Sequence, residues 1–210
     1  MKCPAMNHNY NVRRLFGSAA VLAGGKSRRM GFDKRLLKAG GGTLIETLEA
    51  KLRKVFSEVL LSVNDSIYPR PDVRTITDEY SGLGPLAGIH ACLTAAESEY
   101  VYFTACDMPI INYDYIEYMR RRIALAGGCD ACVTLRGNRL EPFNAFYGRS
   151  AVRVIAEDLA QGKASIRRAL AKLNTIYIDE HEARKFSPDF AMFLNLNTPK
   201  EYCNFFSSLY

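Results

Sequence analysis

The sequence predicts an α/β protein in which helices cover both faces of a mostly parallel sheet, a three-layer α/β/α sandwich. Short apolar runs, typical of strands buried in parallel sheets, alternate with segments whose apolar residues recur every three or four positions. In addition, the 210 residues, of which 48% are hydrophobic, suffice for about one domain with a substantial core. Neither a linker nor an internal repeat interrupts this pattern.

Seven apolar runs are expected to form the strands of this sheet. They cover residues 19–23, 59–63, 73–77, 100–105, 130–135, 143–147 and 175–178. After residue 130 the alternation of strands and helices loosens. The hairpin-like strands and long connections of that region suggest a substrate-binding lobe on the same sheet.

Residues that favour helix starts stand between these runs. Thr43 and Glu46 match a capping box. Pro85 suits a first helical position, and Asn112 suits an N-cap. The expected helices cover about residues 43–55, 85–96, 112–126, 150–160 and 165–173, and a last one starts at Thr198.

The N-terminal segment, residues 1–16, is polar and lacks the apolar stretch of a secretory signal. We expect it to be a flexible arm, with residues 17–210 as a single domain. No apolar run approaches the ~18 residues that span a bilayer. The expected location is therefore the cytoplasm, without a membrane partner.

Cys129 and Cys132 have the CxxC spacing of redox and zinc sites. A zinc site would need a second cysteine pair or histidines at ligand spacing, whereas His8, His90 and His181 are scattered. The residues around Cys132 also resemble a buried strand. We therefore expect these cysteines to act as small hydrophobic side chains.

The net charge of +6, from 28 Lys and Arg against 22 Asp and Glu, suits an anionic ligand or a nucleic acid. A mildly basic surface without a partner explains the charge equally well. The sequence contains no basic run with interleaved aromatic residues and no known nucleic-acid module. A nucleic-acid partner is therefore not expected.

Residues 19–35 combine a predicted strand with a candidate phosphate-binding loop. The apolar run 19–23 leads into Gly24-Gly25 and then into five cations. Glycines expose backbone N–H groups and the cations add positive charge, so this stretch predicts a site for a phosphate compound. The cations are Lys26, Arg28, Arg29, Lys34 and Arg35.

Polar groups follow four of the predicted strands at the point where each strand ends. They are Gly24-Gly25, Asn64, Asp78 and Asp107. In an open α/β sheet, ligands bind beyond the carboxyl ends of the parallel strands. These groups are therefore expected to converge on one binding pocket.

Asp107 follows an apolar strand directly, and Pro109 prevents the strand from continuing. Beside phosphates, a carboxylate in this position suits Mg²⁺, which accepts one protein carboxylate together with phosphate and water oxygens. The alternative role for Asp107 is the N-cap of the next helix, for which Asn112 is better placed.

Two other phosphate motifs fit the opening stretch less well. Residues 20–27 satisfy a relaxed P-loop pattern, but a P-loop needs a looping backbone across 21–24, where the sequence indicates strand. No helical periodicity begins before Leu44, although a P-loop helix would start at Lys26-Ser27. The dinucleotide fingerprint fails as well, because the glycines stand at 24, 25 and 31.

Five segments carry a resemblance to a known family. In chain order they are Leu22-Ala23-Gly24-Gly25-Lys26-Ser27-Arg28-Arg29-Met30-Gly31 with Asp33-Lys34, Gly84-Pro85-Leu86-Ala87-Gly88, Cys106-Asp107-Met108-Pro109, Glu141-Pro142-Phe143-Asn144-Ala145-Phe146-Tyr147 and Asn195-Leu196-Asn197-Thr198-Pro199. Together they resemble the molybdenum cofactor guanylyltransferases, a branch of the nucleotidyltransferases. The resemblance implies a Rossmann-like fold of the glycosyltransferase-A type.

This resemblance also implies which residues meet the nucleotide. Those implied to contact GTP are Leu22, Ala23, Gly24 and Lys34. Asn64 and Asp78 would lie at the guanine and ribose end, and Asp107 would bind Mg²⁺ and contact the nucleotide. The run Leu-Ala-Gly-Gly resembles the guanylyl branch, whereas the cytidylyl branch usually has Leu-Ala-Ala-Gly, so GTP is expected rather than CTP.

The segments 141–147 and 195–197 resemble the pterin-side positions of that family. Glu141-Pro142 departs from the common His-Pro or Gln-Pro form. The acceptor implied by the resemblance is molybdopterin or the molybdenum cofactor.

The implied reaction is attack by the terminal phosphate of molybdopterin on the α-phosphorus of GTP, with pyrophosphate as the leaving group. The attacking group is already an anion, so the reaction needs charge stabilisation rather than a general base. We expect Asp107 to hold Mg²⁺, and Lys34 and Arg28 to bind the phosphates. The amides of Gly24-Gly25 would bind the triphosphate, whereas Lys26 and Arg29 are explained as solvated side chains.

Other functions remain open from the sequence. They are a related cytidylyltransferase, another sugar- or pterin-phosphate nucleotidyltransferase, a P-loop-like GTPase or kinase, and a non-catalytic nucleotide carrier. A carrier would be expected to lack Asp107 or Lys34, and both are present. We expect a monomer or weak homo-oligomer that transiently contacts cofactor-donating and cofactor-accepting proteins.

Overall fold

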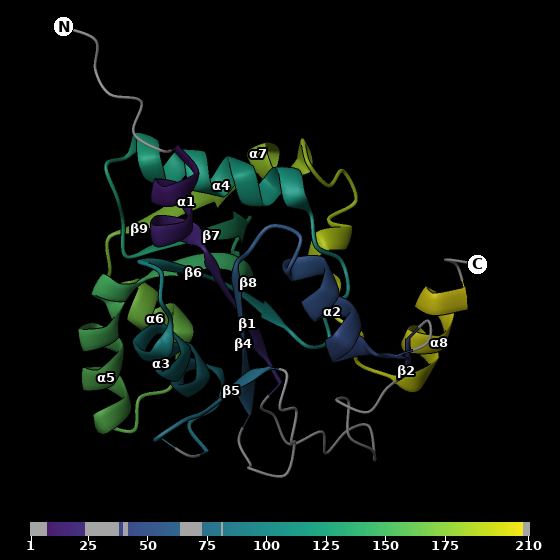
Figure 1. Ribbon diagram of the computed structural model, residues 1–210, viewed down its shortest axis with the longest axis horizontal. Helices are drawn as coiled ribbons and strands as arrows, with labels where there is room; N and C mark the ends of the chain where they lie inside the picture. Colours follow the sequence, from purple (N-terminus) through teal and green to yellow (C-terminus); the bar gives the residue numbers. More distant parts are fainter. Residues whose placement is uncertain (1–7, 24–37, 40–41, 64–72, 81, 208–210) are drawn as a thin grey trace, which may run out of the picture.

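The computed structural model describes residues 8–23, 38–39, 42–63, 73–80 and 82–207. Their main feature is a seven-stranded sheet in the order β5-β4-β1-β6-β8-β7-β9 (Figure 1). The strands are β1 (Ser18–Leu22), β4 (Glu58–Val63), β5 (Arg74–Thr77), β6 (Tyr100–Ala105), β7 (Ala131–Arg136), β8 (Arg139–Gly148) and β9 (Thr175–Asp179). Only the two pairings of β8 are antiparallel in this sheet, which confirms the predicted mostly parallel sheet.

Helices cover both faces of the sheet, as predicted (Figure 1). One face carries α1 (His8–Phe16), α2 (Leu44–Leu52), α4 (Tyr113–Leu125) and α7 (Glu180–Arg184). The other carries α3 (Pro85–Ala95), α5 (Val152–Ala160) and α6 (Ile166–Leu170). A small hairpin of β2 (Lys38–Ala39) and β3 (Gly42–Thr43), the turn η2 (Arg149–Ala151), the turn η3 (Ala191–Phe193) and α8 (Pro199–Ser207) complete the described elements.

The order of the strands creates a switch point between β1 and β6. From β1 the chain moves outward to β4 and β5, and it then returns to β6 on the opposite side of β1. The crossover connections therefore diverge at this point, where open α/β sheets form their ligand crevice.

The structure confirms the three helix starts that were predicted from capping residues or from an N-terminal proline. Thr43 Oγ1 accepts a hydrogen bond from the Glu46 backbone N–H (3.2 Å), and Glu46 Oε2 accepts one from the Thr43 N–H (2.6 Å). Asn112 Oδ1 accepts a hydrogen bond from the Tyr115 N–H (2.9 Å), and Pro85 is the first residue of α3. These bonds satisfy N–H groups that the first helical turn cannot satisfy by itself.

The structure differs from the expected flexible arm over residues 8–16, which form α1. Phe16 is buried at the end of this helix and stacks on Tyr100, with ring centroids 5.1 Å apart. The Arg14 carbonyl accepts a hydrogen bond from the Glu99 N–H (3.1 Å). Tertiary contacts thus order a segment whose polar composition suggested an arm; residues 1–7 of that arm lie outside the described residues.

Cys129 and Cys132 are buried, as expected for small hydrophobic side chains. Burial raises the pKa of the Cys129 thiol to about 11 and also raises the pKa of Cys132. Within the described ranges, no group of three or more His, Cys, Asp or Glu is arranged to hold a metal ion. The described environment of the pair therefore matches the hydrophobic interpretation.

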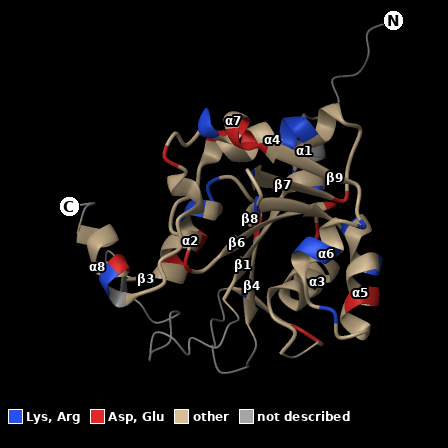
Figure 2. Ribbon diagram, turned by 180° about the vertical axis from the view of Figure 1, so that it is seen from behind, with Lys and Arg blue, Asp and Glu red and all other residues tan. Residues whose placement is uncertain are grey.

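Lys and Arg lie beside Asp and Glu in the region of α4 and α7 (Figure 2). The helix α4, for example, carries Glu117 next to Arg120, and Arg122 pairs with Glu182 of α7. Among the residues that the structure describes, no helix is long and apolar enough to cross a membrane.

Candidate active site

The carboxyl end of β1 is joined to both of its neighbours at the switch point. The Ala23 N–H donates a hydrogen bond to the Ser62 carbonyl of β4 (2.9 Å). On the other side, the Leu22 carbonyl accepts one from the Cys106 N–H that follows β6 (3.1 Å). Leu22 and Ala23 therefore lie at the same edge as Asp107, which is the next residue after Cys106.

The turn that contains Asp107 is held by a hydrogen bond of its own and by two other segments. The Asp107 carbonyl accepts a hydrogen bond from the Leu196 N–H (2.8 Å), and the Met108 N–H donates to the Ala105 carbonyl (3.0 Å). Lys51 of α2 donates from Nζ to the Pro109 carbonyl (2.7 Å). These bonds hold a half-buried carboxylate at the switch point, and Asn112, not Asp107, caps α4.

Lys51 is a positioning residue that the sequence did not reveal. Burial, with a smaller contribution from Lys54, lowers the pKa of its amine. The Tyr113 hydroxyl donates a hydrogen bond to the Lys51 carbonyl (3.2 Å). The helical period of α2 predicts the side of the helix on which Lys51 lies, but the contact with Pro109 depends on the tertiary fold.

Asp78 directly follows β5, at the same edge of the sheet. Its Oδ1 is buried and has no hydrogen-bond partner among the described residues. Burial raises the pKa of this carboxyl group. A buried polar oxygen without a partner costs free energy, and such a group at a ligand edge is a candidate binding residue.

Gly88 allows α3 to approach this edge closely. A Cβ at this position would lie 2.6 Å from Ser62 Oγ of β4 and 3.1 Å from Leu22 Cδ2 of β1. Any larger residue would move the helix or both strand ends. The glycine therefore brings the first turns of α3 against the carboxyl ends of β1 and β4.

The structure brings four of the predicted site residues to this edge: Leu22, Ala23, Asp78 and Asp107. The other predicted site residues lie outside the described ranges. They are Gly24, Gly25, Arg28, Lys34 and Asn64. Their assigned roles stay predictions.

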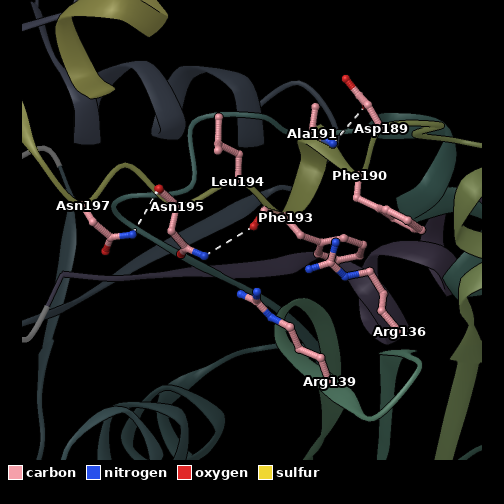
Figure 3. A pocket seen from close by; sticks show the side chains of 9 residues that line it. All are labelled: Arg136, Arg139, Asp189, Phe190, Ala191, Phe193, Leu194, Asn195 and Asn197. Atoms are coloured by element: carbon pink, nitrogen blue, oxygen red, sulfur yellow. Dashed lines mark hydrogen bonds between the residues drawn. The ribbon is translucent and has the colours of Figure 1, made fainter. Parts of the chain in front are cut away.

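A pocket of about 480 Å³ lies between the β7–β8 hairpin and residues 189–197 (Figure 3). Its lining residues are Arg136, Arg139, Asp189, Phe190, Ala191, Phe193, Leu194, Asn195 and Asn197. Arg136 ends β7 and Arg139 begins β8, so the hairpin places both cations on this pocket. The two asparagines belong to the predicted pterin-side segment, whereas the two arginines were not predicted.

Asn144 connects the sheet to the segment that lines this pocket. It has a left-handed backbone, with φ of 51°, and a buried side chain. Its Oδ1 accepts a hydrogen bond from the Tyr102 hydroxyl of β6 (3.0 Å), and its Nδ2 donates to the Met192 carbonyl. Residues 189–197 are thus tied to β6, the strand that leads into the turn of Asp107.

A doubly wound sheet with aspartates beyond the carboxyl ends of its strands is typical of nucleotide-binding α/β enzymes. The family model "MobA-like NTP transferase domain" matches residues 19–176. The chain belongs to this family and is a nucleotidyltransferase. The family and the fold class predicted from the sequence are confirmed.

Relatives match over almost the whole chain. A protein named probable molybdenum cofactor guanylyltransferase from Peptoclostridium acidaminophilum is 47% identical, over 90% of this chain and 88% of the relative. A molybdenum cofactor guanylyltransferase from Syntrophotalea carbinolica is 46% identical, over 89% of each chain. The crystal structure of molybdopterin-guanine dinucleotide biosynthesis protein A from Archaeoglobus fulgidus is 29% identical and covers 91% of this chain and 98% of its own, with a TM-score of 0.77.

Proposed function

We propose that this nucleotidyltransferase transfers GMP from GTP to the terminal phosphate of molybdopterin, forming the guanine dinucleotide cofactor and releasing pyrophosphate. The observation that carries the proposal is the polar edge at the β1–β6 switch point, where Asp107 stands beside the end of β1. The choice of GTP and molybdopterin is supported by the names of the relatives and by the Leu-Ala-Gly-Gly run.

In this proposal, GTP lies along the carboxyl ends of β5, β4 and β1. The backbone at Leu22 and Ala23, continued by the Gly24-Gly25 amides, binds the nucleotide and its triphosphate. Asp78 offers its unpartnered Oδ1 to the ribose and guanine end, together with Asn64.

The residues present fit Mg²⁺ bound jointly with phosphate. Among the described residues no all-protein metal cage exists, and Asp107 is a single carboxylate beside the proposed triphosphate. One carboxylate supplemented by phosphate and water oxygens is an ordinary Mg²⁺ environment. When bound, the ion supplies positive charge that stabilises the transferring phosphoryl group.

The chain's own residues orient the two phosphates and stabilise the leaving group. Lys34 and Arg28 bind the phosphates, and the Gly24-Gly25 amides donate hydrogen bonds to the triphosphate. The acceptor phosphate is already an anion, so no residue is assigned as a general base.

Replacing Lys34 with alanine is expected to lower turnover on the order of 10²-fold, because a cation that stabilises the leaving group is lost. Pyrophosphate release from GTP and molybdopterin measures the effect. Lys26→Ala is the matched control and is expected to change turnover little. Unchanged turnover in K34A would contradict the role of Lys34.

Replacing Asp78 with asparagine is expected to weaken GTP binding roughly 10-fold, through loss of a charge-assisted hydrogen bond. In the protein without GTP, the same substitution is expected not to lower the stability of the fold. Because the folded pKa of Asp78 is raised, the ionised carboxylate costs stability once the pH rises above the unfolded pKa. D78N should therefore unfold at the same temperature as the wild type or higher at pH 7.

Calorimetric titration with GTP and thermal unfolding measure the two effects of D78N. The exposed Asp114 of α4 provides the matched control for binding, since Asp114→Asn should leave the affinity for GTP unchanged. Unchanged GTP affinity in D78N would remove Asp78 from the nucleotide site.

The test of the whole proposal is pyrophosphate release from GTP, CTP and ATP, each with and without molybdopterin. Release that requires both GTP and molybdopterin is the expected result. A preference for CTP would identify a cytidylyltransferase, and release of the γ-phosphate alone would identify a GTPase. Tight GTP binding without turnover would identify a carrier.

We also propose that the enzyme works in the cytoplasm as a monomer or weak homo-oligomer, in transient contact with proteins that donate and accept the cofactor. The free cysteines of the described chain agree with a reducing compartment.

A further inference from the structure

The pocket between the β7–β8 hairpin and residues 189–197 opens at the same sheet edge as Asp107. In the antiparallel β6–β8 pair, Phe103 lies opposite Ala145. Continuing along β8 toward its start at Arg139 therefore leads past the carboxyl end of β6. In addition, Leu196 donates its N–H to the Asp107 carbonyl (2.8 Å), and its neighbours Asn195 and Asn197 line the pocket.

Arg136, which lines this pocket, forms an ion pair with the buried Glu141 of β8. Arg136 donates to Glu141 Oε1 from Nε (2.8 Å) and from a terminal nitrogen. Its guanidinium lies 4.8 Å from the ring centroid of Phe190 and 5.5 Å from that of Phe193. Because Glu141 is buried and bonded by two nitrogens of Arg136, its charge is already balanced.

Arg139 is a second cation on the same carboxylate, and it is held far less firmly. Its Nε lies 3.1 Å from Glu141 Oε1, and its side chain is 64% exposed. Apart from this ion pair, the Arg139 side chain has no hydrogen-bond partner among the described residues. Figure 3 shows its guanidinium directed toward Asn195 and Asn197.

The acid at the rim does not neutralise Arg139. Asp189 Oδ1 accepts hydrogen bonds from the Ala191 N–H (3.0 Å) and the Ser187 hydroxyl (3.3 Å). These bonds lower the pKa of Asp189, and Figure 3 shows its side chain at the far end of the pocket from Arg139 and Asn197. The end of the pocket near the asparagines therefore carries an uncompensated guanidinium.

We propose that Arg139 binds the phosphate of the acceptor substrate and holds it beside the turn of Asp107, an inference that rests on the proposed function. A guanidinium matches a phosphate with two parallel N–H donors. The amides of Asn195 and Asn197 add polar contacts to the rest of the acceptor. The position of the pocket favours the acceptor over GTP, because it lies on the β8–β7 side of β6 whereas the nucleotide edge is on the β5–β4–β1 side.

The test compares Arg139→Gln with the wild type at saturating GTP. Losing a charge-assisted, two-point contact is expected to raise the KM for molybdopterin roughly 10- to 100-fold. The Kd for GTP, measured without acceptor, should stay within about 2-fold, because phosphate contacts on the GTP side are separate. Arg139→Lys should show a smaller rise in the KM for molybdopterin, because lysine keeps the positive charge but lacks the two parallel N–H donors of the guanidinium.

Arg153→Gln is the matched control, since Arg153 is an 87% exposed arginine on α5, on the opposite face of the sheet. It should change neither constant. An unchanged KM for molybdopterin in R139Q, or a matching rise in the Kd for GTP, would overturn the proposal.

A direct binding measurement separates this proposal from the proposed function. Titration of the protein with molybdopterin in the absence of GTP reports the pocket whether or not transfer takes place. Binding that weakens in R139Q but not in R153Q supports the role of Arg139 even if no pyrophosphate is released. Equal binding by R139Q and the wild type refutes this role even if transfer occurs.

Discussion

Replacing Asp107 with asparagine is expected to lower Mg²⁺-dependent GMP transfer on the order of 10³-fold. The substitution keeps the shape of the side chain but removes the charge proposed to hold the ion, and metal stabilisation of a phosphoryl group contributes several kcal/mol. The fold should persist, because the backbone hydrogen bonds of this turn and the bond from Lys51 to the Pro109 carbonyl are unchanged in the variant. Pyrophosphate release over a range of Mg²⁺ concentrations measures the effect.

Asp114→Asn provides the control, because Asp114 is an exposed aspartate seven positions along the chain. It should leave transfer and its Mg²⁺ dependence unchanged. If D107N transfers GMP at the wild-type rate with the same Mg²⁺ dependence, the ion must be held by other residues. A matching thermal unfolding temperature for D107N and the wild type would exclude misfolding as the cause of lost activity.

Replacing Arg120 with alanine is expected to destabilise the protein by about 3 kcal/mol. Arg120 is buried, and one of its terminal nitrogens donates to the carbonyls of Phe16 and Val55, both at 3.1 Å. Its guanidinium also lies 4.8 Å from the ring centroid of Phe56. The substitution would leave two carbonyls without this donor and open a cavity among the ends of α1, α2 and α4.

Urea unfolding measures this loss as a lower midpoint at an unchanged slope. Arg121→Ala is the control, because Arg121 is the exposed neighbour of Arg120 on the same helix, and its loss should cost less than about 0.5 kcal/mol. A destabilisation of R120A no larger than that of R121A would show that the carbonyls find other partners. The GTP affinity of folded R120A should equal that of the wild type.

Elements with short-range signals could be predicted from the sequence. The hydrogen bonds of the Thr43–Glu46 capping box and of the Asn112 N-cap join residues only three positions apart, so the sequence of that short segment is enough to predict them. Helix α1 has no such signal. It is held by the stacking of Phe16 on Tyr100 and by the hydrogen bond from Glu99, which join segments far apart in the chain.

Strand β8 shows how a local signal can mislead. The apolar run predicted a strand over residues 143–147, whereas the structure starts β8 at Arg139 and includes Pro142, which has no N–H to donate. Pairing with β6 is recorded only as far as Ala145, and the pairing with β7 shifts register between Cys132 and Thr134. Pro142 therefore occupies an irregular part of the ladder, where a missing donor costs little.

The placement of Asp78 and Asp107 at one edge of the sheet could be predicted because one rule of sheet geometry covers it. Parallel strands bring their carboxyl ends together; Asp78 is the first residue after β5, and Asp107 is the second after β6. The pocket on the other side obeys no such rule. Arg139 lines the same pocket as Asn195 and Asn197 because the β7–β8 hairpin folds back and the Tyr102–Asn144–Met192 hydrogen bonds hold residues 189–197 against the sheet.

Because β8 is antiparallel to its neighbours, two different parts of the chain form the ligand edge of the sheet: the carboxyl ends of β5, β4, β1 and β6, and the β7–β8 hairpin. In a fully parallel sheet, only the carboxyl ends of strands lie at the edge that binds ligands. Here the first residue of β8, Arg139, also lies at that edge, because β8 runs in the opposite direction. The Gly137-Asn138 turn can therefore change in length or sequence without altering β5, β4 or β1. If Arg139 binds the acceptor as proposed, a change in this hairpin would alter acceptor binding and leave the nucleotide edge in place.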